Sequence, residues 1–361
     1  MGEVTLGDMG EREIIASVLR PRYGRMDTPF GDDCAWLSPE GSLSGVWVAT
    51  TDPCPTPMAA ILGYSDYYYY GWLLAAINLS DLAAAGATPV GMLSSLLLPS
   101  SMRVSEFTRL LDGLDECCME AGTRVVGGNL KESDRVELTA TAIGICAGSA
   151  PLGRHGARIG DTIGVIGQFG SFWAGVFLLQ RDLEVFTPHR QELIDSVLTP
   201  RPKVSIGREL RELGLVHACL DNSDGLYPSL CSLCESSDVG VSLRFDDIQY
   251  DAPVQEVART MKVDPARFAL GWGDWQLIVT FSDEQLGAIT EACDRAGVGY
   301  RTIGTVTEPG ELTLAYEDQS GPLLALDSQR FTPDSWFTKG IESYVSTLLE
   351  APLVGERRAT G

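Results

Sequence analysis

The chain has 361 residues, of which 44% are hydrophobic and 21% are charged, and its net charge is −22. The length exceeds that of one ordinary core and predicts two domains, and the composition is typical of a folded globular protein. The acidic balance disfavours nucleic acid as a partner, because phosphate backbones bind to basic patches. We expect most of the 49 acidic residues on a solvated surface.

The cysteines, the histidines and the apolar segments indicate a cytoplasmic protein without a membrane anchor. Nine cysteines and three histidines are present, and their spacing completes no zinc-binding set. Free thiols in a reducing compartment are therefore expected. The N-terminus lacks the basic start and apolar core of a signal peptide. The longest apolar run, 71–82, is interrupted by Asn78 and Ser80 and is too short and too polar to cross a bilayer.

Hydrophobic periodicity predicts alternating helices and strands along the chain. In the first half we expect a helix at 11–20, a strand at 46–51, a helix at 71–86, a strand at 90–98, a helix at 104–122 and a strand at 137–147. In the second half we expect strands at 161–167, 217–220, 240–245, 274–281, 299–306 and 311–316, with helices at 172–180 and 283–296. A connector near 149–156 separates the halves, and the segment after about 345 reads as a polar, frayed tail.

Five short polar motifs carry the most specific chemical signal in the chain. They are Gly31-Asp32-Asp33, Thr50-Thr51-Asp52, Asn78-Leu79-Ser80-Asp81, Gly127-Gly128-Asn129 and Asp221-Asn222-Ser223-Asp224-Gly225. Most of them follow a predicted strand. Carboxylates gathered at strand ends form a cage of hard oxygen ligands, which suits Mg²⁺ carrying a nucleoside triphosphate.

Each motif also has a purely structural explanation. Asp and Gly favour turns, Asp52 ends a strand, and the Ser-Asp pairs at Ser80 and Ser223 are expected at helix starts, where such residues cap helices. The matching pairs also hint at a duplicated α/β architecture. Asp81 is harder to explain structurally, because it lies in an apolar segment where a carboxylate needs a partner such as a metal.

The glycine motif leaves two alternatives open. Gly127 and Gly128 allow backbone N–H groups to approach a phosphate closely, or they form a strand-end turn. Lys131 lies just beyond them and either reaches a phosphate or is solvated. No Walker A sequence occurs, so nucleotide binding depends on another scaffold.

In this order, the motifs resemble those of the thiamine-monophosphate kinases, in the superfamily of aminoimidazole ribonucleotide synthetase and selenophosphate synthetase. The resemblance covers roughly residues 8–320, and the stretch from Asn78 to Pro89 is the most specific part of it. It implies an α/β (α+β) fold of two domains, with N-terminal sheets pairing in a homodimer. The expected boundaries are 1–150 for an ATP- and Mg-binding dimerisation domain, 151–345 for a C-terminal α/β domain, and 346–361 for a polar tail.

The resemblance also implies the site residues and the cofactors, ATP and Mg²⁺. The metal ligands carried over are Asp32, Asp33, Thr51, Asp52, Asp81 and Asp224. Residues expected near the nucleotide are Asn78, Gly127, Gly128, Asn129, Lys131 and Ser223. Asp81 and Asp224 are assigned to catalysis, through metals that neutralise charge during in-line transfer of the γ-phosphoryl group.

The departures from the family pattern concern the acceptor. Asn129 stands where the family has an acidic ligand, and residues 53–57 replace a segment with Glu and His near the substrate. We therefore expect an ATP-dependent kinase for a small-molecule acceptor that need not be thiamine monophosphate. Two alternatives stay open: a synthetase or cyclase that activates an amide or carbonyl oxygen by phosphorylation, and a non-catalytic nucleotide-binding protein.

Overall fold

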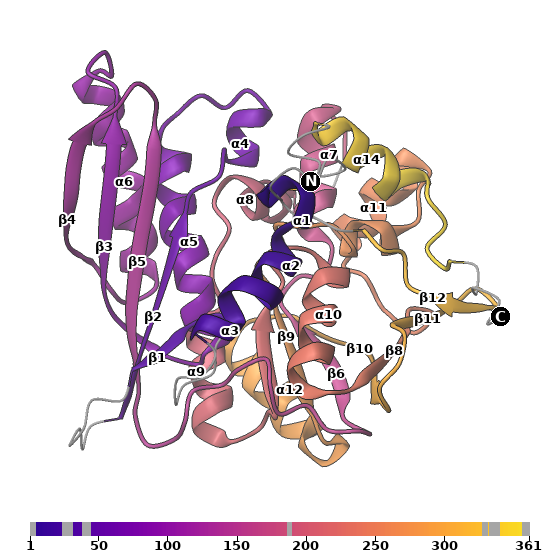
Figure 1. Ribbon diagram of the computed structural model, residues 1–361. Coiled ribbons are helices and arrows are strands. Elements are labelled where there is room, and N and C mark those ends of the chain that lie inside the picture. The colour runs from indigo at the N-terminus through magenta and orange to yellow at the C-terminus, as the bar shows by residue number, and fades with distance from the viewer. Residues whose placement is uncertain are drawn as a thin grey trace.

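Two β-sheets, one from each half of the chain, lie on either side of a buried central helix in the computed structural model (Figure 1). The structure describes residues 5–23, 32–37, 45–185, 190–326, 331 and 340–355. Among the helices in these ranges, none has the length and hydropathy needed to cross a membrane.

The first sheet has five strands in the order β1-β2-β5-β3-β4. Its strands are β1 (Ala35–Leu37), β2 (Val46–Pro53), β3 (Thr88–Leu98), β4 (Val125–Glu132) and β5 (Glu137–Cys146). Only β3 and β4 pair in parallel, and β4 is an edge strand whose residues are almost all exposed. Helices α5 (Tyr68–Ala84) and α6 (Val104–Glu120) pack together behind this sheet.

The second sheet has seven strands in the order β12-β11-β8-β10-β6-β9-β7. Its strands are β6 (Thr162–Ile166), β7 (Ala218–Asp221), β8 (Gly240–Arg244), β9 (Leu277–Phe281), β10 (Tyr300–Thr307), β11 (Thr313–Tyr316) and β12 (Gln319–Pro322). Every residue of β6, β7 and β9 is buried, which explains their continuous apolar character in the sequence.

The remaining helices surround these two sheets. They are α1 (Leu6–Met9), α2 (Glu11–Ile14), η1 (Ile15–Leu19), α3 (Arg20–Tyr23), α4 (Met58–Ile61), α7 (Ser171–Gln180), α8 (Arg190–Leu198), α9 (Val204–Leu213), α10 (Leu226–Ser237), α11 (Ala252–Met261), η2 (Pro265–Ala269), η3 (Asp283–Gln285), α12 (Leu286–Ala296) and α14 (Ile341–Glu350). The helix expected at 11–20 is thus helical throughout, with a π-helical middle.

Small residues let α5 occupy the centre of the molecule. A Cβ atom at Gly71 would lie 1.8 Å from the carbonyl oxygen of Leu110, and one at Gly113 would lie 2.0 Å from that of Tyr68. A Cβ atom at Gly207 of α9 would lie 2.1 Å from the carbonyl oxygen of Ala83. Because these glycines allow close backbone approach on two sides, residues 71–84 of α5 are all buried. Asp81 is therefore fixed between the two sheets.

Two expectations about secondary structure are wrong, and so is one of the alternatives left open. Ser80 and Asp81 lie near the C-terminal end of α5, not at its start, because the apolar helix begins well before them. The strand expected from 274 begins only at Leu277, since Trp275 has a φ of 41° that no extended strand accepts. Gly127 and Gly128 lie inside β4, which continues to Glu132, and do not form a turn at its end.

The prediction of a polar, frayed tail after about residue 345 is also wrong for the residues up to Val354. Helix α14 crosses the boundary drawn at 345, and its Tyr344 and Leu348 are buried. Leu323 and Val354 then form an isolated antiparallel bridge next to the second sheet. The helix forms because its apolar residues recur at helical spacing between polar ones, so they pack on one side. Residues 356–361 lie outside the described part of the chain.

Candidate active site

Three carboxylates from distant parts of the sequence meet at one point. One oxygen each of Asp33, Asp81 and Asp221 lies within 4.8 Å of the others. Asp33 precedes β1, Asp81 lies near the end of α5, and Asp221 is the last residue of β7. The side chain of Asp33 is 3% exposed, and Asp81 and Asp221 are also buried. The cluster therefore joins residues of both halves of the chain.

Neutral hydroxyl groups orient two of these carboxylates. The Thr50 hydroxyl donates a hydrogen bond to Asp81 Oδ2 at 2.5 Å. Asp221 accepts two such bonds, from Ser80 at 2.8 Å and from Ser223 at 2.9 Å. Because hydroxyl groups bring no charge, they fix the carboxylates without cancelling their mutual repulsion.

Arg154 supplies the positive charge beside the cluster. Its guanidinium contacts Asp33 Oδ1 at 2.5 Å and also donates to the Ser232 hydroxyl at 3.1 Å. The backbone N–H of Arg154 donates to Asp32 Oδ1 at 2.6 Å, so Asp32 points towards the loop that carries this arginine. One arginine faces three close carboxyl groups, so full ionisation of all three would leave an excess of negative charge.

The pKa values of the three carboxyl groups reflect this environment. Burial, followed by the nearby Asp221 and Asp33, raises the pKa of Asp81 well above its usual range. Burial and then Asp33 raise the pKa of Asp221 to about 7. Burial raises the pKa of Asp33 as well, although Arg154 opposes this shift. Each carboxylate thus ionises more readily when a further cation arrives.

The donor set fits Mg²⁺. Carboxylate and hydroxyl oxygens are the hard ligands that this ion prefers. Asp33 Oδ2 is buried and has no hydrogen-bond partner in the part of the chain that the structure describes, so this oxygen is available to a cation. Asp33, Asp81 and Asp221 are the residues that would hold such a metal.

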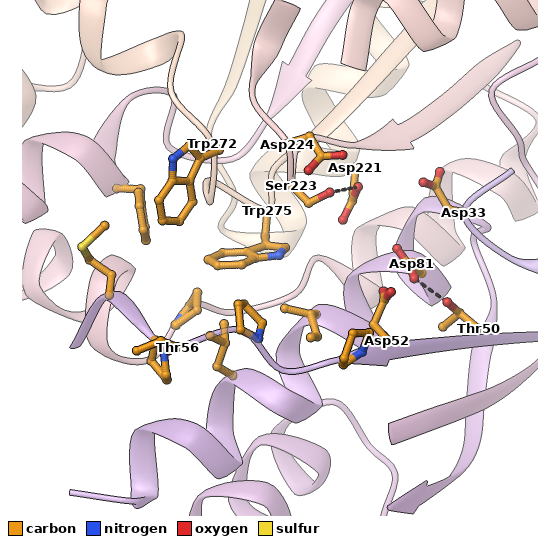
Figure 2. Close-up of a pocket in the computed structure, with 18 of the residues that line it drawn as sticks. Asp33, Thr50, Asp52, Thr56, Asp81, Asp221, Ser223, Asp224, Trp272 and Trp275 are labelled. Atoms are coloured by element: carbon orange, nitrogen blue, oxygen red, sulfur yellow. Dashed lines mark hydrogen bonds between the residues drawn. The ribbon is translucent and has the colours of Figure 1, made fainter. Parts of the chain in front are cut away.

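The cluster forms one end of a cavity of about 480 Å³ (Figure 2). Asp52 and Asp224 also line this end, while Trp275 lies across the middle and Trp272 beyond it. The rest of the wall is mainly apolar and consists of Pro53, Pro55, Thr56, Pro57, Met58, Tyr69, Leu73, Ile77, Phe172, Val197, Leu198 and Pro200. One cavity therefore presents an acidic end and an aromatic, apolar end.

Most of the predicted metal ligands lie in this cavity. Asp32, Asp33, Asp52, Asp81 and Asp224 all line it, and so does Ser223. Their roles as ligands or catalytic groups stay predictions.

Thr51 does not lie in the cavity, because its hydroxyl is 2.8 Å from that of Thr141 on the other face of β2. Successive side chains on a strand alternate between faces, so the neighbouring Thr50 takes the place expected for Thr51. Sequence reasoning also missed Asp221 and Arg154 as site residues. Asp221 shares with Asp52 the same signal, an acid at the end of a predicted strand.

The residues predicted near the nucleotide are placed differently. Asn78 is fully buried; its amide accepts from the Asp52 N–H at 3.1 Å and donates to the Leu74 carbonyl at 2.9 Å, so it supports Asp52 from behind. Gly127, Gly128, Asn129 and Lys131 lie exposed on β4. Gly128 is three strands away from Asp52 in the same sheet row, about 14 Å at the usual strand spacing. Within one chain, these residues do not join the acidic cluster.

Comparison with known proteins agrees with this architecture. The family model for the N-terminal domain of AIR synthase related protein matches residues 31–146, and that for the C-terminal domain matches residues 158–317. A thiamine-monophosphate kinase of Corynebacterium glutamicum is 30% identical over 324 residues, which cover 88% of this chain and 92% of the relative. The chain belongs to the thiamine-monophosphate kinase family. This membership confirms the predicted two-domain α/β fold and the predicted enzyme class, an ATP-dependent kinase.

The similarity to one further relative and to one solved structure extends over almost the whole length of those proteins. A thiamine-monophosphate kinase of Synechococcus elongatus is 29% identical over 350 residues, covering 92% of this chain and 99% of the relative. The solved structure described as AaThiL complexed with AMPPCP and TMP has a TM-score of 0.75 and 25% identity. It covers 87% of this chain and 96% of that chain.

The buried carboxylates predict how the stability of the metal-free protein depends on pH. Their folded-state pKa values exceed the unfolded value of 3.8, so their contribution is fully present below that value and is lost as the pH rises through about 7. In a chelator, the thermal midpoint should fall by roughly 5 °C or more from about pH 5.5 to about pH 8. Differential scanning calorimetry measures this fall, and Asp81→Asn should reduce it.

Added Mg²⁺ should raise the midpoint more at the higher pH, because the metal binds ionised carboxylates. A thermal midpoint that changes neither with pH nor with added Mg²⁺ would contradict the assignment of the carboxylate cluster as a metal site.

Proposed function

We propose that this protein transfers the γ-phosphoryl group of Mg-bound ATP to thiamine monophosphate. The observation that carries the proposal is the single cavity with a carboxylate cluster at one end and two indole rings at the other. Its volume of about 480 Å³ lies in the range of small-molecule sites. Relatives at 29 to 30% identity are named thiamine-monophosphate kinases, which supports the same acceptor here.

The acidic end supports phosphoryl transfer. Bound at Asp33, Asp81 and Asp221, Mg²⁺ would neutralise the phosphate charge that develops during transfer. The hydroxyl groups of Thr50, Ser80 and Ser223 hold these carboxylates in place, so little reorganisation is needed. Arg154 donates a hydrogen bond to Asp33. With a metal bound to the Asp33 carboxylate, the guanidinium would be able to pair with a phosphate oxygen instead.

The aromatic end supports an acceptor with a flat, positively charged ring. Indole faces attract organic cations, and the thiazolium ring of thiamine monophosphate is such a cation. The segment 53–57, which lacks the Glu and His of other family members, forms part of the same wall with its prolines. Rings bound between prolines and indoles need no charged partner, so this wall accepts the ring by shape and polarisability.

A phosphate acceptor also agrees with the groups available. The cavity wall contains no histidine among the residues that the structure describes. The oxygen of a phosphomonoester is already largely ionised near neutral pH, so it attacks without a dedicated general base. In-line transfer then breaks the bond between the γ-phosphorus and the bridging oxygen, and leaves ADP and a diphosphate.

Mass spectrometry of a reaction with Mg-ATP tests this proposal. With thiamine monophosphate, we expect equal amounts of ADP and thiamine diphosphate, without release of inorganic phosphate. Unphosphorylated thiamine is the matched control and should give no product. Asp81→Asn should lower turnover by about 100-fold or more, because the metal loses a ligand.

Two results would overturn the proposal. Absence of thiamine diphosphate at saturating substrate would remove thiamine monophosphate as the acceptor. Inorganic phosphate together with a cyclised or dehydrated product would instead support a synthetase.

We also propose that two copies of the chain pair through the first sheet. Helices α5 and α6 lie behind one side of this sheet, whereas Val90, Leu93 and Val126 are 40% to 52% exposed on β3 and β4. Large apolar side chains gathered at a sheet edge are typical of an interaction surface. The exposed position of Gly127 and Gly128 on β4 agrees with a role at that interface.

Sedimentation equilibrium tests the pairing. The wild type should sediment at twice the chain mass, and the double variant Leu93→Glu with Val126→Glu should sediment as a single chain, because it places charges at the interface. Val104, 80% exposed at the start of α6, offers a control through Val104→Glu. A monomeric wild type at micromolar concentration would contradict the proposal.

A further inference from the structure

The two indole rings of the cavity come from one short loop with an unusual backbone. Trp272 and Trp275 lie between η2 and β9, and both line the cavity. Gly273 has a φ of 85° and Trp275 a φ of 41°, which a bulky residue rarely adopts. Such strain persists only where surrounding contacts fix the backbone. The loop must therefore be held from outside.

Aromatic side chains hold the peptide groups of Trp272 on both sides. The indole Nε1–H of Trp173 donates to the Trp272 carbonyl at 2.8 Å. The Trp272 N–H donates to the Tyr344 hydroxyl at 3.0 Å. The Tyr344 ring lies 5.6 Å from Trp173 and 6.2 Å from Trp272, so the three rings form one packed group. Tyr344 thus combines a hydrogen bond and ring packing at the cavity wall.

Tyr344 belongs to α14, which lies beyond both segments matched by the family models. This helix is anchored to the second domain. Arg267 donates to the carbonyl oxygens of Leu348 and Ala351, each at 2.9 Å, at the C-terminal end of α14. Tyr344 and Leu348 are buried. The helix therefore acts as a fixed support for Tyr344, and Figure 1 shows it against α7, the helix that carries Trp173.

We infer that Tyr344 is a positioning residue for the acceptor: it fixes Trp272, and α14 thereby determines how tightly the acceptor ring is bound. The inference rests on the proposed function, in which the aromatic end of the cavity receives that ring. A binding wall discriminates between ligands only when its side chains are held to within about half an ångström. Here a hydroxyl from a distant helix provides that restraint.

Steady-state kinetics of Tyr344→Phe test the inference. The substitution removes one oxygen atom and keeps the ring, so the fold is retained. We expect the KM for thiamine monophosphate to rise about fivefold, the effect of losing one hydrogen bond, while the KM for ATP stays within about twofold. Tyr300→Phe is the matched control, because the Tyr300 hydroxyl is buried and makes no hydrogen bond within the described ranges of the chain. It should leave both constants unchanged.

Amide hydrogen exchange gives a second readout that needs no acceptor. In Tyr344→Phe, exchange of the Trp272 N–H should accelerate about fivefold, and in Tyr300→Phe it should not. Unchanged exchange would overturn the inference, and so would faster exchange with an unchanged KM for the acceptor. A wild type without turnover of thiamine monophosphate would overturn the proposed function instead, and exchange would then decide the link between Tyr344 and Trp272 by itself.

Discussion

The repulsion between three buried carboxylates is the constraint on which the rest of the structure depends. Asp33, Asp81 and Asp221 are brought within 4.8 Å of one another although burial raises the pKa of each. The fold tolerates this because Arg154 and three hydroxyl groups compensate part of the cost. A cluster of this kind, assembled from both halves of the fold, can bind a divalent cation. The bound cation can in turn bind the phosphate groups of a triphosphate.

The central helix α5 brings its carboxylate, Asp81, to the cluster between the two sheets. Its glycine and alanine residues allow it to lie against α6 and α9 at short range, and so its polar end reaches the space between the sheets. Asp81 and Ser80, neighbours on this helix, serve different partners: Asp81 accepts from Thr50 of the first sheet, and Ser80 donates to Asp221 of the second. The packing of α5 therefore fixes the geometry of the site and the docking of the two halves at once.

The sequence predicted much of this, and its failures have physical reasons. Most strands and the helices α5, α6, α7 and α12 followed from periodicity, whereas α8, α9 and α11 were not expected. The acidic motifs identified four further acidic cavity residues besides Asp81. The alternation of side chains along a strand places Thr50, and not Thr51, on the same face as Asp52. The separation of Gly128 from Asp52 depends on the order of strands in the sheet, which no local pattern contains. Helix α14 has only a few apolar positions among polar ones, although Ile341, Tyr344, Val345 and Leu348 follow helical spacing, and its burial depends on contacts with distant residues such as Arg267.

The most direct test of the central claim is to locate a metal by anomalous scattering. Crystals with Mn²⁺ in place of Mg²⁺ and a non-hydrolysable ATP analogue should show a peak within about 2.5 Å of carboxylate oxygens from Asp33, Asp81 and Asp221. A peak bound only elsewhere, or no peak at saturating Mn²⁺, would contradict the claim that these carboxylates are gathered to hold a cation against a triphosphate.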